Sequence, residues 1–357
     1  MGFGVYVHIP FCSRRCDYCA FATWTDRSAL MEPYSTACRN ELVGAVTAGM
    51  PRATSVFFGG GTPSLLPARL LVGVLGEVPR ADDAEVTVEC NPETVTGPLL
   101  DAYRAAGVNR LSFGVQSMTP HVLAGLGRAH DPASARRAVE LAVSAGFDDF
   151  NVDLIYGGAG ERDVDWQSTL DAVLGLVPGG PPHVSAYALT VEPGTPLAAD
   201  SARHPDDDIQ ADRYLRAERS LSAAGLQNYE ISNWARPGHE CRHNRLYWSQ
   251  GEYRGIGCAA HSHAGGRRSW NVRTPERFIS LVSGGSSAEG GAEVLDADGR
   301  RREGLELSLR TGAGVPVDAL DDLDLLVERQ LVVRRGDRLV LTIEGRLLAN
   351  EVAMRLR

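Results

Sequence analysis

The sequence predicts an α/β fold: a partial (β/α)6 barrel followed by a C-terminal α+β module of winged-helix-like type. Short apolar runs alternate with helix-forming segments over about the first 200 residues. Polar or glycine residues follow nearly every apolar run, and the composition changes beyond this region. Strict alternation of strands and helices indicates parallel strands joined by right-handed crossovers.

Six apolar runs have the length and residue content of buried strands. They cover residues 4–11, 54–61, 85–92, 110–117, 150–157 and 183–190. Between them lie segments with helical spacing, such as MEPYSTACRNELVGAV (31–46), PASARRAVELAVSAG (132–146) and DVDWQSTLDAVLGLV (163–177). Gly146 is a typical helix stop signal.

The residues that follow the strands distinguish a barrel from a doubly wound sheet. Polar and glycine residues stand at or just past five strand ends: Cys12–Cys19, Gly59–Thr62, Glu89 with Asn91, Gln116, and Asp153. A barrel collects its site from the carboxyl ends of many strands, whereas a doubly wound sheet binds ligands at one switch point. We therefore expect a barrel with its site on that rim.

The remainder of the chain predicts two further parts. A loop and a helix ending at Gly225 precede a Gly-, His- and aromatic-rich stretch, which we expect to be irregular or hairpin structure beside the barrel rim. SGGSSAEGGAE (283–293) is typical of a linker. Two helices, a hairpin with its turn at Gly336 and Asp337, and a last helix then indicate the winged-helix-like module. The predicted division is a barrel at 1–225, an extension at 226–285 and the module at 286–357.

Composition excludes several classes of protein. The net charge of −9 and the pI of about 5.5 argue against nucleic-acid binding, so we expect the module to act as a docking domain or lid. No secretion signal or membrane-spanning run is apparent, and we expect a cytoplasmic protein. Peripheral membrane contact and homodimerisation stay open. The odd number of cysteines, 7, favours metal binding or catalysis over disulfides.

Three of these cysteines form a C-x3-C-x2-C motif at Cys12, Cys16 and Cys19. Three thiolates on one loop can hold three irons of a cubane [4Fe–4S] cluster and leave the fourth iron open to a substrate. We expect S-adenosylmethionine (SAM) at that iron. Two other interpretations are a zinc site that borrows His8, and plain buried thiols; zinc sites usually carry a C-x2-C pair at both ends, and only one pair occurs here.

Six motifs in order resemble the radical SAM family that contains oxygen-independent coproporphyrinogen III oxidase and the heme chaperone HemW. The likeness extends from residue 5 to about residue 280. The motifs are HIPFCSRRCDYCAF (8–21), FFGGGTPSLL (57–66), ECNPE (89–93), NRLSFGVQS (109–117), VDLIYG (152–157) and HNRLYW (243–248).

The resemblance implies a radical SAM barrel in which the cluster cleaves SAM to a 5′-deoxyadenosyl radical. It implies that the cofactor residues are Tyr6, Tyr18, Gly59, Gly60, Gly61, Thr62, Glu89, Gln116, Arg128 and Asp153. Taken alone, a carboxylate at a strand end can instead cap a helix, Arg128 can be a solvated surface charge, and the glycines can mark only a turn.

Three features favour a heme chaperone over the oxidase, whose activity is the oxidative decarboxylation of propionate side chains. The oxidases carry a further cysteine where this chain has Phe21, and they have a longer segment ahead of the cluster than the 11 residues here. HNRLYW (243–248) matches the H-N-x-x-Y-W signature of the chaperones. We therefore expect heme transfer to an acceptor protein, with a respiratory protein as one candidate acceptor, and we assign no catalytic residue.

The same signature suggests how heme is held. His243 is the expected iron ligand, and Tyr247 and Trp248 offer flat apolar surface to the macrocycle. His261, His263 and Cys241 are competing ligands. We interpret Cys38, Cys90 and Cys258 as buried apolar residues. One departure from the family is Glu161, which occupies a position that is usually glutamine. The family pattern therefore does not predict the conformation of this loop over the pocket.

Overall fold

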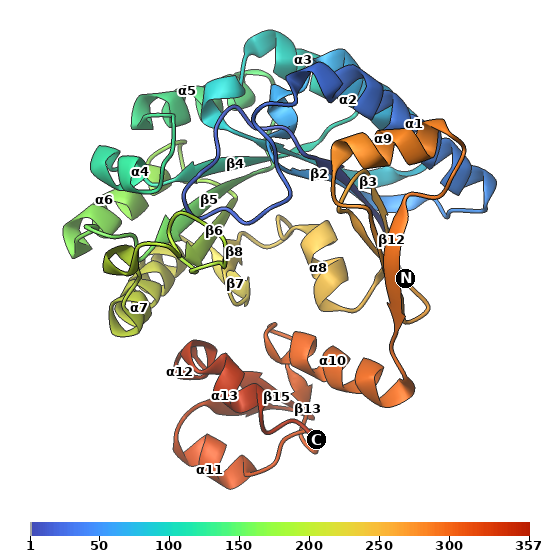
Figure 1. Ribbon diagram of the computed structural model, residues 1–357. Helices are drawn as coiled ribbons and strands as arrows, with labels where there is room; N and C mark the ends of the chain where they lie inside the picture. Colours follow the sequence, from blue (N-terminus) through green and yellow to red (C-terminus); the bar gives the residue numbers. More distant parts are fainter. Residues whose placement is uncertain (1) are drawn as a thin grey trace.

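Six parallel strands form a curved sheet with helices on its outer side in the computed structural model, which describes residues 2–357 (Figure 1). The predicted partial barrel and all six predicted strands are confirmed. In spatial and sequence order the strands are β1 (Phe3–Ile9), β2 (Ala53–Gly60), β3 (Arg80–Cys90), β4 (Arg110–Gln116), β5 (Phe150–Tyr156) and β6 (His183–Ala188).

Six helices cover the outer face of these strands, and the strand pattern explains why. On β1, Val5, Val7 and Ile9 are buried in the main hydrophobic core, whereas Tyr6 and His8 alternate with them and face the lumen. The six helices are α1 (Met31–Thr47), α2 (Ala68–Gly76), α3 (Gly97–Ala105), α5 (Pro132–Ser144), α6 (Asp163–Leu174) and α7 (Asp207–Ala223). A further short helix, α4 (Pro120–Gly125), packs in a separate cluster at the rim. The lumen face therefore carries the polar residues.

Side-chain caps fix where several of these helices begin. Thr96 caps α3, Asp131 caps α5 and Asp206 caps α7, each by accepting a hydrogen bond from the backbone N–H three residues later. Proline occupies the first turn of α3 and α5, where no N–H partner is required. The caps keep the loops at the strand ends short and defined.

The region 226–285 is not a separate layer but extends both ends of the sheet. β7 (Gln227–Glu230) and β8 (Asn233–Ala235) join the β6 end, and β9 (Glu252–Ile256) pairs in parallel with β1. β10 (His261–Ala264) and β11 (Arg267–Asn271) continue outward from β9, and α8 (Arg242–Trp248) and α9 (Pro275–Ser283) complete the region.

The expected linker at 283–293 is wrong in part. Residues 289–294 form β12 (Glu289–Val294), which pairs with β11 and is the last strand of the 12-stranded sheet. Its side chains are almost all exposed, so the sequence shows no buried face by which a strand is recognised. The main sheet thus continues beyond the expected boundary at residue 286.

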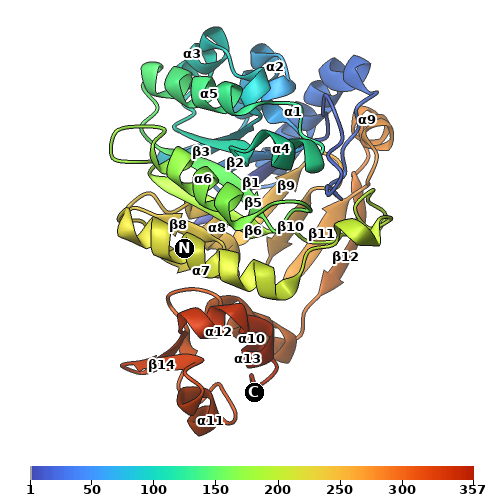
Figure 2. The ribbon, with the colours of Figure 1, turned by 90° about the vertical axis from the view of Figure 1, so that its left-hand side faces the viewer.

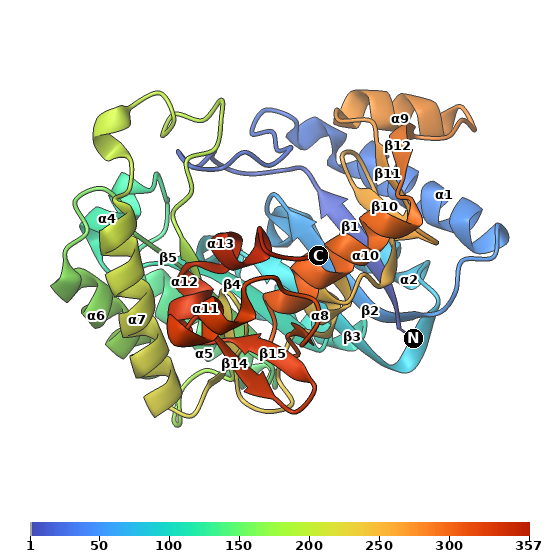
Figure 3. The ribbon, with the colours of Figure 1, turned by 90° about the horizontal axis from the view of Figure 1, so that it is seen from below.

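The C-terminal module has its own small core and its own three-stranded sheet. It comprises α10 (Ala297–Leu309), β13 (Val315–Pro316), α11 (Leu323–Glu328), β14 (Val332–Arg335), β15 (Arg338–Leu341), α12 (Ile343–Leu347) and α13 (Ala349–Ala353). The predicted last helix is thus two short helices. The module lies below the barrel in Figures 1 and 2 and in front of the strands in Figure 3. Two pairs of helices join the module to the rest of the chain: α10 contacts α8, and α12 contacts α7. No helix among residues 2–357 has the length and apolar content needed to cross a membrane.

Candidate functional site

The cysteine loop leaves the carboxyl end of β1 and is closed at its base. Cys12 N–H donates to Trp24 O at 3.0 Å, and Trp24 N–H donates to Pro10 O at 2.8 Å. Cys12, Cys16 and Cys19 are partly buried and form no disulfide. Burial is the main cause that raises the pKa of Cys12, and Cys19 and Cys16 add to the rise, which places the three thiols within electrostatic reach of one another.

His8 anchors this loop and is not available to a metal. Its Nε2 lies 2.9 Å from Ala22 O, so that nitrogen carries the proton and donates it. The other nitrogen, Nδ1, then accepts from Tyr6 OH at 3.2 Å. Both nitrogens are engaged, and this arrangement argues against the zinc site that borrows His8.

A hydrogen-bonded chain joins two of the cysteines through three neighbouring strand ends. Arg128 Nη1 donates to Cys16 Sγ at 3.4 Å, and its Nη2 donates to Asn91 Oδ1 at 2.9 Å. Asn91 Nδ2 donates to Thr62 Oγ1 at 3.2 Å, and Thr62 Oγ1 donates to Cys12 Sγ at 3.8 Å. Donors aimed at thiolate sulfurs are a means of tuning an iron–sulfur cluster.

The glycines at the carboxyl end of β2 are required by close contacts. A Cβ at Gly61 would lie 2.7 Å from Phe11 O and 3.0 Å from Cys12 Sγ, and one at Gly60 would lie 2.4 Å from the His8 ring. A Cβ at Gly59 would lie 3.2 Å from the Glu89 carboxyl group. These glycines therefore let the backbone pass directly between the cysteine loop and the lumen.

Two half-buried carboxyl groups face the lumen. Burial raises the pKa of Glu89 to about 8, the nearby charge of Asp153 adds to the rise, and the Gly60 N–H, 3.1 Å from Oε2, opposes it. Asp153 accepts hydrogen bonds of 2.8 Å from Ser112 Oγ and from Asn151 Nδ2. Glu89 thus keeps acceptor capacity for a ligand, whereas Asp153 is largely satisfied within the protein.

Gln116 and Arg128 each present an unpartnered buried atom beside these carboxyl groups. Gln116 Oε1 and Arg128 Nε have no hydrogen-bond partner among the described residues. The backbone of Gln116 has φ 65°, an uncommon and costly conformation for glutamine that is typical of functional sites. Tyr18 lies near this group. Burial raises the pKa of Tyr18, and the nearby charge of Arg128 opposes that rise.

The structure separates the four expected heme residues. His243, Tyr247 and Trp248 lie on α8, and a Cβ at Gly4, near the start of β1, would lie 3.0 Å from the His243 ring. These three residues therefore lie near the amino ends of β1 and β2, away from the cysteine loop. His261 instead begins β10, shortly after the carboxyl end of β9.

His243 is buried and has a partner on each ring nitrogen. Nδ1 lies 2.9 Å from Ser55 Oγ and Nε2 lies 2.8 Å from Tyr247 OH. Burial lowers its pKa to about 3, so the ring is neutral. Glu85 accepts from His243 N–H at 3.0 Å and so fixes the start of α8. In this arrangement His243 offers no nitrogen to iron and instead ties α8 to the barrel.

Glu161 does not project over the site. Its carboxylate accepts from Gly157 N–H at 2.8 Å and pairs with Arg213 of α7 at 2.7 Å. Both side chains are almost fully buried. The departure from the usual glutamine is thus a buried ion pair that attaches α7 to the loop after β5.

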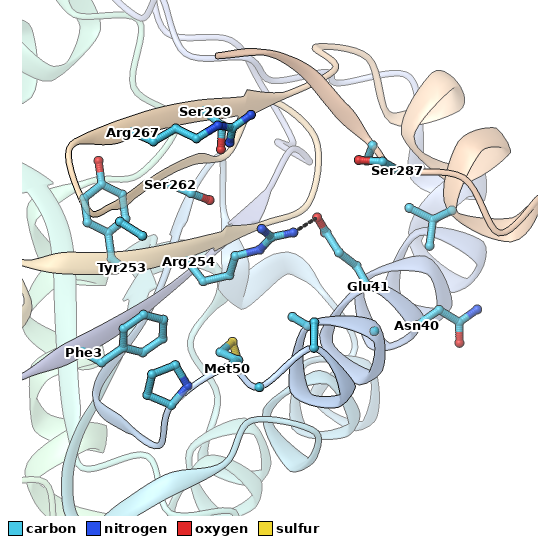
Figure 4. A pocket seen from close by; sticks show the side chains of 18 of the residues that line it. Phe3, Asn40, Glu41, Met50, Tyr253, Arg254, Ser262, Arg267, Ser269 and Ser287 are labelled. Carbon is cyan, nitrogen blue, oxygen red and sulfur yellow. Dashed lines mark ion pairs between the residues drawn. The ribbon is translucent and has the colours of Figure 1, made fainter. Parts of the chain in front are cut away.

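A cavity of about 780 Å³ lies on the outer side of the sheet and not at the cysteine loop. Figure 4 shows it between α1 and the strands β9 to β11, with Ser262 and Ser269 on the strand side and the ion pair of Arg254 with Glu41 beside them. No site residue predicted from the sequence lines this cavity.

Comparison with known proteins agrees with the iron–sulfur function predicted for the cysteine loop. Residues 6–173 match the family model of the Radical SAM superfamily. The Mycobacterium tuberculosis protein named heme chaperone HemW is 42% identical, with 99% of this chain and 94% of the relative aligned. The Escherichia coli heme chaperone HemW is 41% identical over 72% of this chain and 69% of its own. The chain belongs to the HemW family of radical SAM proteins.

A solved structure also supports the architecture. The Escherichia coli coproporphyrinogen III oxidase HemN, described as a radical SAM enzyme, aligns with 99% of this chain and 89% of its own at a TM-score of 0.85 and 25% identity. HemW and HemN thus share the barrel and the C-terminal module, and the fold alone does not separate their functions.

The residues of the rim fit the cofactors that a radical SAM family implies. Three unpaired thiols share one loop, two of their sulfurs accept hydrogen bonds, and glycines clear the adjoining space. Among residues 2–357, no three His, Cys, Asp or Glu side chains are arranged for a single metal ion. Three thiols on one loop are the donor set expected of a [4Fe–4S] cluster, whose ligands bind different irons.

Asn91 was expected at the rim but given no role, and Trp24 was missed. Asn91 connects Thr62 to Arg128, and Trp24 closes the cysteine loop by a β-bridge to Phe11. The ECNPE motif contains Asn91 and could have indicated it. Nothing in the sequence indicates Trp24, because its role depends on a backbone pairing across the loop.

Proposed function

We propose that this chain is a heme chaperone that binds a [4Fe–4S] cluster, SAM and heme, and delivers heme to acceptor proteins. The observation that carries the proposal is the similarity to HemW relatives over nearly the whole chain, including the C-terminal module. Phe21 supports it, because this side chain is 63% exposed on the cysteine loop where the oxidases carry a further thiol. The free state of all seven cysteines supports a reducing compartment, and we place the protein in the cytoplasm.

Cys12, Cys16 and Cys19 would hold the cluster, which when bound supplies an electron for reductive cleavage of SAM. The rest of the chemistry belongs to the side chains of the rim. Arg128 and Thr62 donate hydrogen bonds to two of the sulfurs, and such donors tune a cluster that these sulfurs would hold.

The SAM site would use the groups that are unsatisfied in the protein. Gln116 Oε1 accepts, Arg128 Nε donates, and the Glu89 carboxyl group offers an acceptor or, below its pKa of about 8, a donor. Gly59, Gly60 and Gly61 allow a ligand to approach the backbone. Asp153 and Tyr6 would form the polar lining rather than primary contacts, since both already have partners.

An anaerobic assay separates the chaperone from the oxidase. We expect the reconstituted protein to bind heme stoichiometrically and to leave coproporphyrinogen unchanged, with the Escherichia coli coproporphyrinogen III oxidase as the positive control. Formation of protoporphyrinogen would establish the alternative, oxidative decarboxylation of propionate side chains. Failure to bind heme would refute the chaperone function.

The retained cofactor site motivates a second measurement. We infer that SAM cleavage, where it occurs, regulates heme transfer. The test is 5′-deoxyadenosine production under strong reduction with and without heme. A heme-dependent rate supports regulation; an equal rate in both samples contradicts it.

A further inference from the structure

His261 differs from the other histidines among the 9 in the chain. Within residues 2–357, its imidazole has no hydrogen-bond or ion-pair partner, and the residue is exposed. Each of the others has a partner on at least one ring nitrogen. They are His8, His121, His130, His183, His204, His239, His243 and His263. His261 is therefore the histidine with both nitrogens available to a ligand.

Strand alternation places this imidazole on the lumen side of the sheet. Ser262 pairs with Ser269, and both line the outer cavity beneath α1 (Figure 4). His261 pairs with Trp270 one position away, so these two side chains lie on the opposite face. That face is the one turned away from the outer helices.

His261 also lies on the same rim as the cysteine loop. β9 runs parallel to β1, and β10 begins after the carboxyl end of β9, as the cysteine loop begins after that of β1. A Cβ at Gly255 would lie 2.1 Å from His261 O, and Gly255 is the register partner of Tyr6. His261 is thus one strand away from a predicted cofactor residue.

Trp270 provides a flat apolar surface beside the imidazole. The two ring centroids are 5.9 Å apart with an interplanar angle of 33°. The indole lies over Gly291 of β12, where a Cβ would be 2.6 Å from the ring. Glycine at this position lets the indole lie flat on the strand with its other face directed away from it. An imidazole next to an aromatic plane suits a metalloporphyrin, which needs an axial ligand and apolar contact.

We propose that His261 is the axial ligand of the heme iron and that Trp270 contacts the macrocycle. This inference rests on the proposed heme-chaperone function and names its binding site. Coordination requires only the donation of a nitrogen lone pair to iron in place of water, with no electron transfer. His243 differs in that iron could reach its ring only if the Ser55 or Tyr247 contact broke and α8 moved.

The test compares heme spectra of full-length, cluster-loaded variants. We expect His261→Ala to lose the imidazole-ligated absorbance and electron paramagnetic resonance signals and to bind heme about tenfold or more weakly. His261→Cys should replace the imidazole signature by a thiolate one, which a structural role would not produce. Trp270→Leu should weaken binding and keep the imidazole signature. His204→Ala removes another exposed histidine and should match the wild type.

The outcomes distinguish the two proposals. His261 is exposed and unbonded, so its substitution should leave the unfolding transition unchanged. If the wild type binds heme and His261→Ala keeps the imidazole signature, the ligand assignment is wrong while the chaperone function stands. If the wild type binds no heme, the function itself fails.

Discussion

Glu89 lies half-buried on the lumen side of the barrel, and its pKa is about 8, against an ordinary value of 4.5. Between these two values the folded protein holds a proton that the unfolded chain has released. Stability therefore falls as the pH rises from about 5 to 8 and then levels off. Under the proposed function, this cost is linked to the use of the carboxyl group in binding SAM.

Glu89→Gln should remove this pH dependence. The amide oxygen can still accept from Gly60 N–H, so the contact that fixes the glycine loop is kept. We expect the variant to gain stability over the SAM-free wild type progressively between pH 5 and 8, by a few kcal/mol at most, since one pKa unit corresponds to about 1.4 kcal/mol. Urea unfolding at several pH values measures the difference. Parallel pH profiles would contradict the assigned ionisation.

Residue identities in the cysteine loop could be predicted from spacing, because the chemistry of three thiols is local. The same is not true of the heme residues. The HNRLYW motif drew attention to His243, but its partners Ser55 and Tyr247 satisfy it. Trp270 went unnoticed, because its place beside His261 depends on the pairing of β10 with β11.

Helix α8 is the element whose role the structure changes most. Its first turn donates two backbone hydrogen bonds to Glu85, from Arg242 N–H at 2.8 Å and His243 N–H at 3.0 Å. His243 then bonds to Ser55 on β2. The motif therefore fastens the helix to the barrel, and this accounts for His243 without heme.

His243→Ala should destabilise the protein by about 2–4 kcal/mol, because it leaves Ser55 and Tyr247 without a buried partner and opens a cavity beside Gly4. The imidazole-ligated heme signature should remain. Arg245→Ala on the same helix is the matched control, since this side chain is exposed, and it should change stability by less than about 0.5 kcal/mol. Equal unfolding midpoints for the two variants would contradict the anchoring role.

The strands also show what a sequence reveals. β1 to β6 were predictable because their apolar runs end in polar or glycine residues at one rim. β12 was not predictable, because it is an exposed edge strand that contains Gly290 and Gly291. It buries no alternate side chains, so its sequence lacks the alternation of apolar and polar residues that indicates a strand. The parallel pairing of β9 with β1 joins segments more than 240 positions apart and has no local signal.

At the scale of the whole molecule, a partly buried ion pair is one of the contacts by which the module docks on the barrel. Arg346 of α12 pairs with Glu218 of α7 at 3.0 Å, with side-chain exposures of 12% and 14%. Its guanidinium carbon lies 5.6 Å from the Tyr214 ring centroid, and Trp234 Nε1 donates to Glu218 at 2.8 Å. The pair is therefore shielded and oriented, unlike the exposed ion pairs of the surface.

Arg346→Ala should loosen the module without unfolding the barrel. We expect faster amide hydrogen exchange in α12 and unchanged exchange in β1 to β6. In a double-mutant cycle, we expect a coupling energy of about 1–3 kcal/mol between Arg346→Ala and Glu218→Gln. Arg302→Ala is the control, because its ion pair with Glu306 is exposed and lies within one helix, α10. Unaltered exchange in α12 would show that other contacts dock the module.

The central claim is a [4Fe–4S] cluster held by Cys12, Cys16 and Cys19 with one iron open to SAM. Its most direct test is anaerobic reconstitution, followed by iron and sulfide analysis and electron paramagnetic resonance of the reduced protein with and without SAM. We predict about four irons and four sulfides per chain, a spectrum that changes when SAM is added, and loss of the cluster when the three cysteines are replaced by alanine. Zinc in place of iron, or a cluster spectrum that SAM leaves unchanged, would contradict the account.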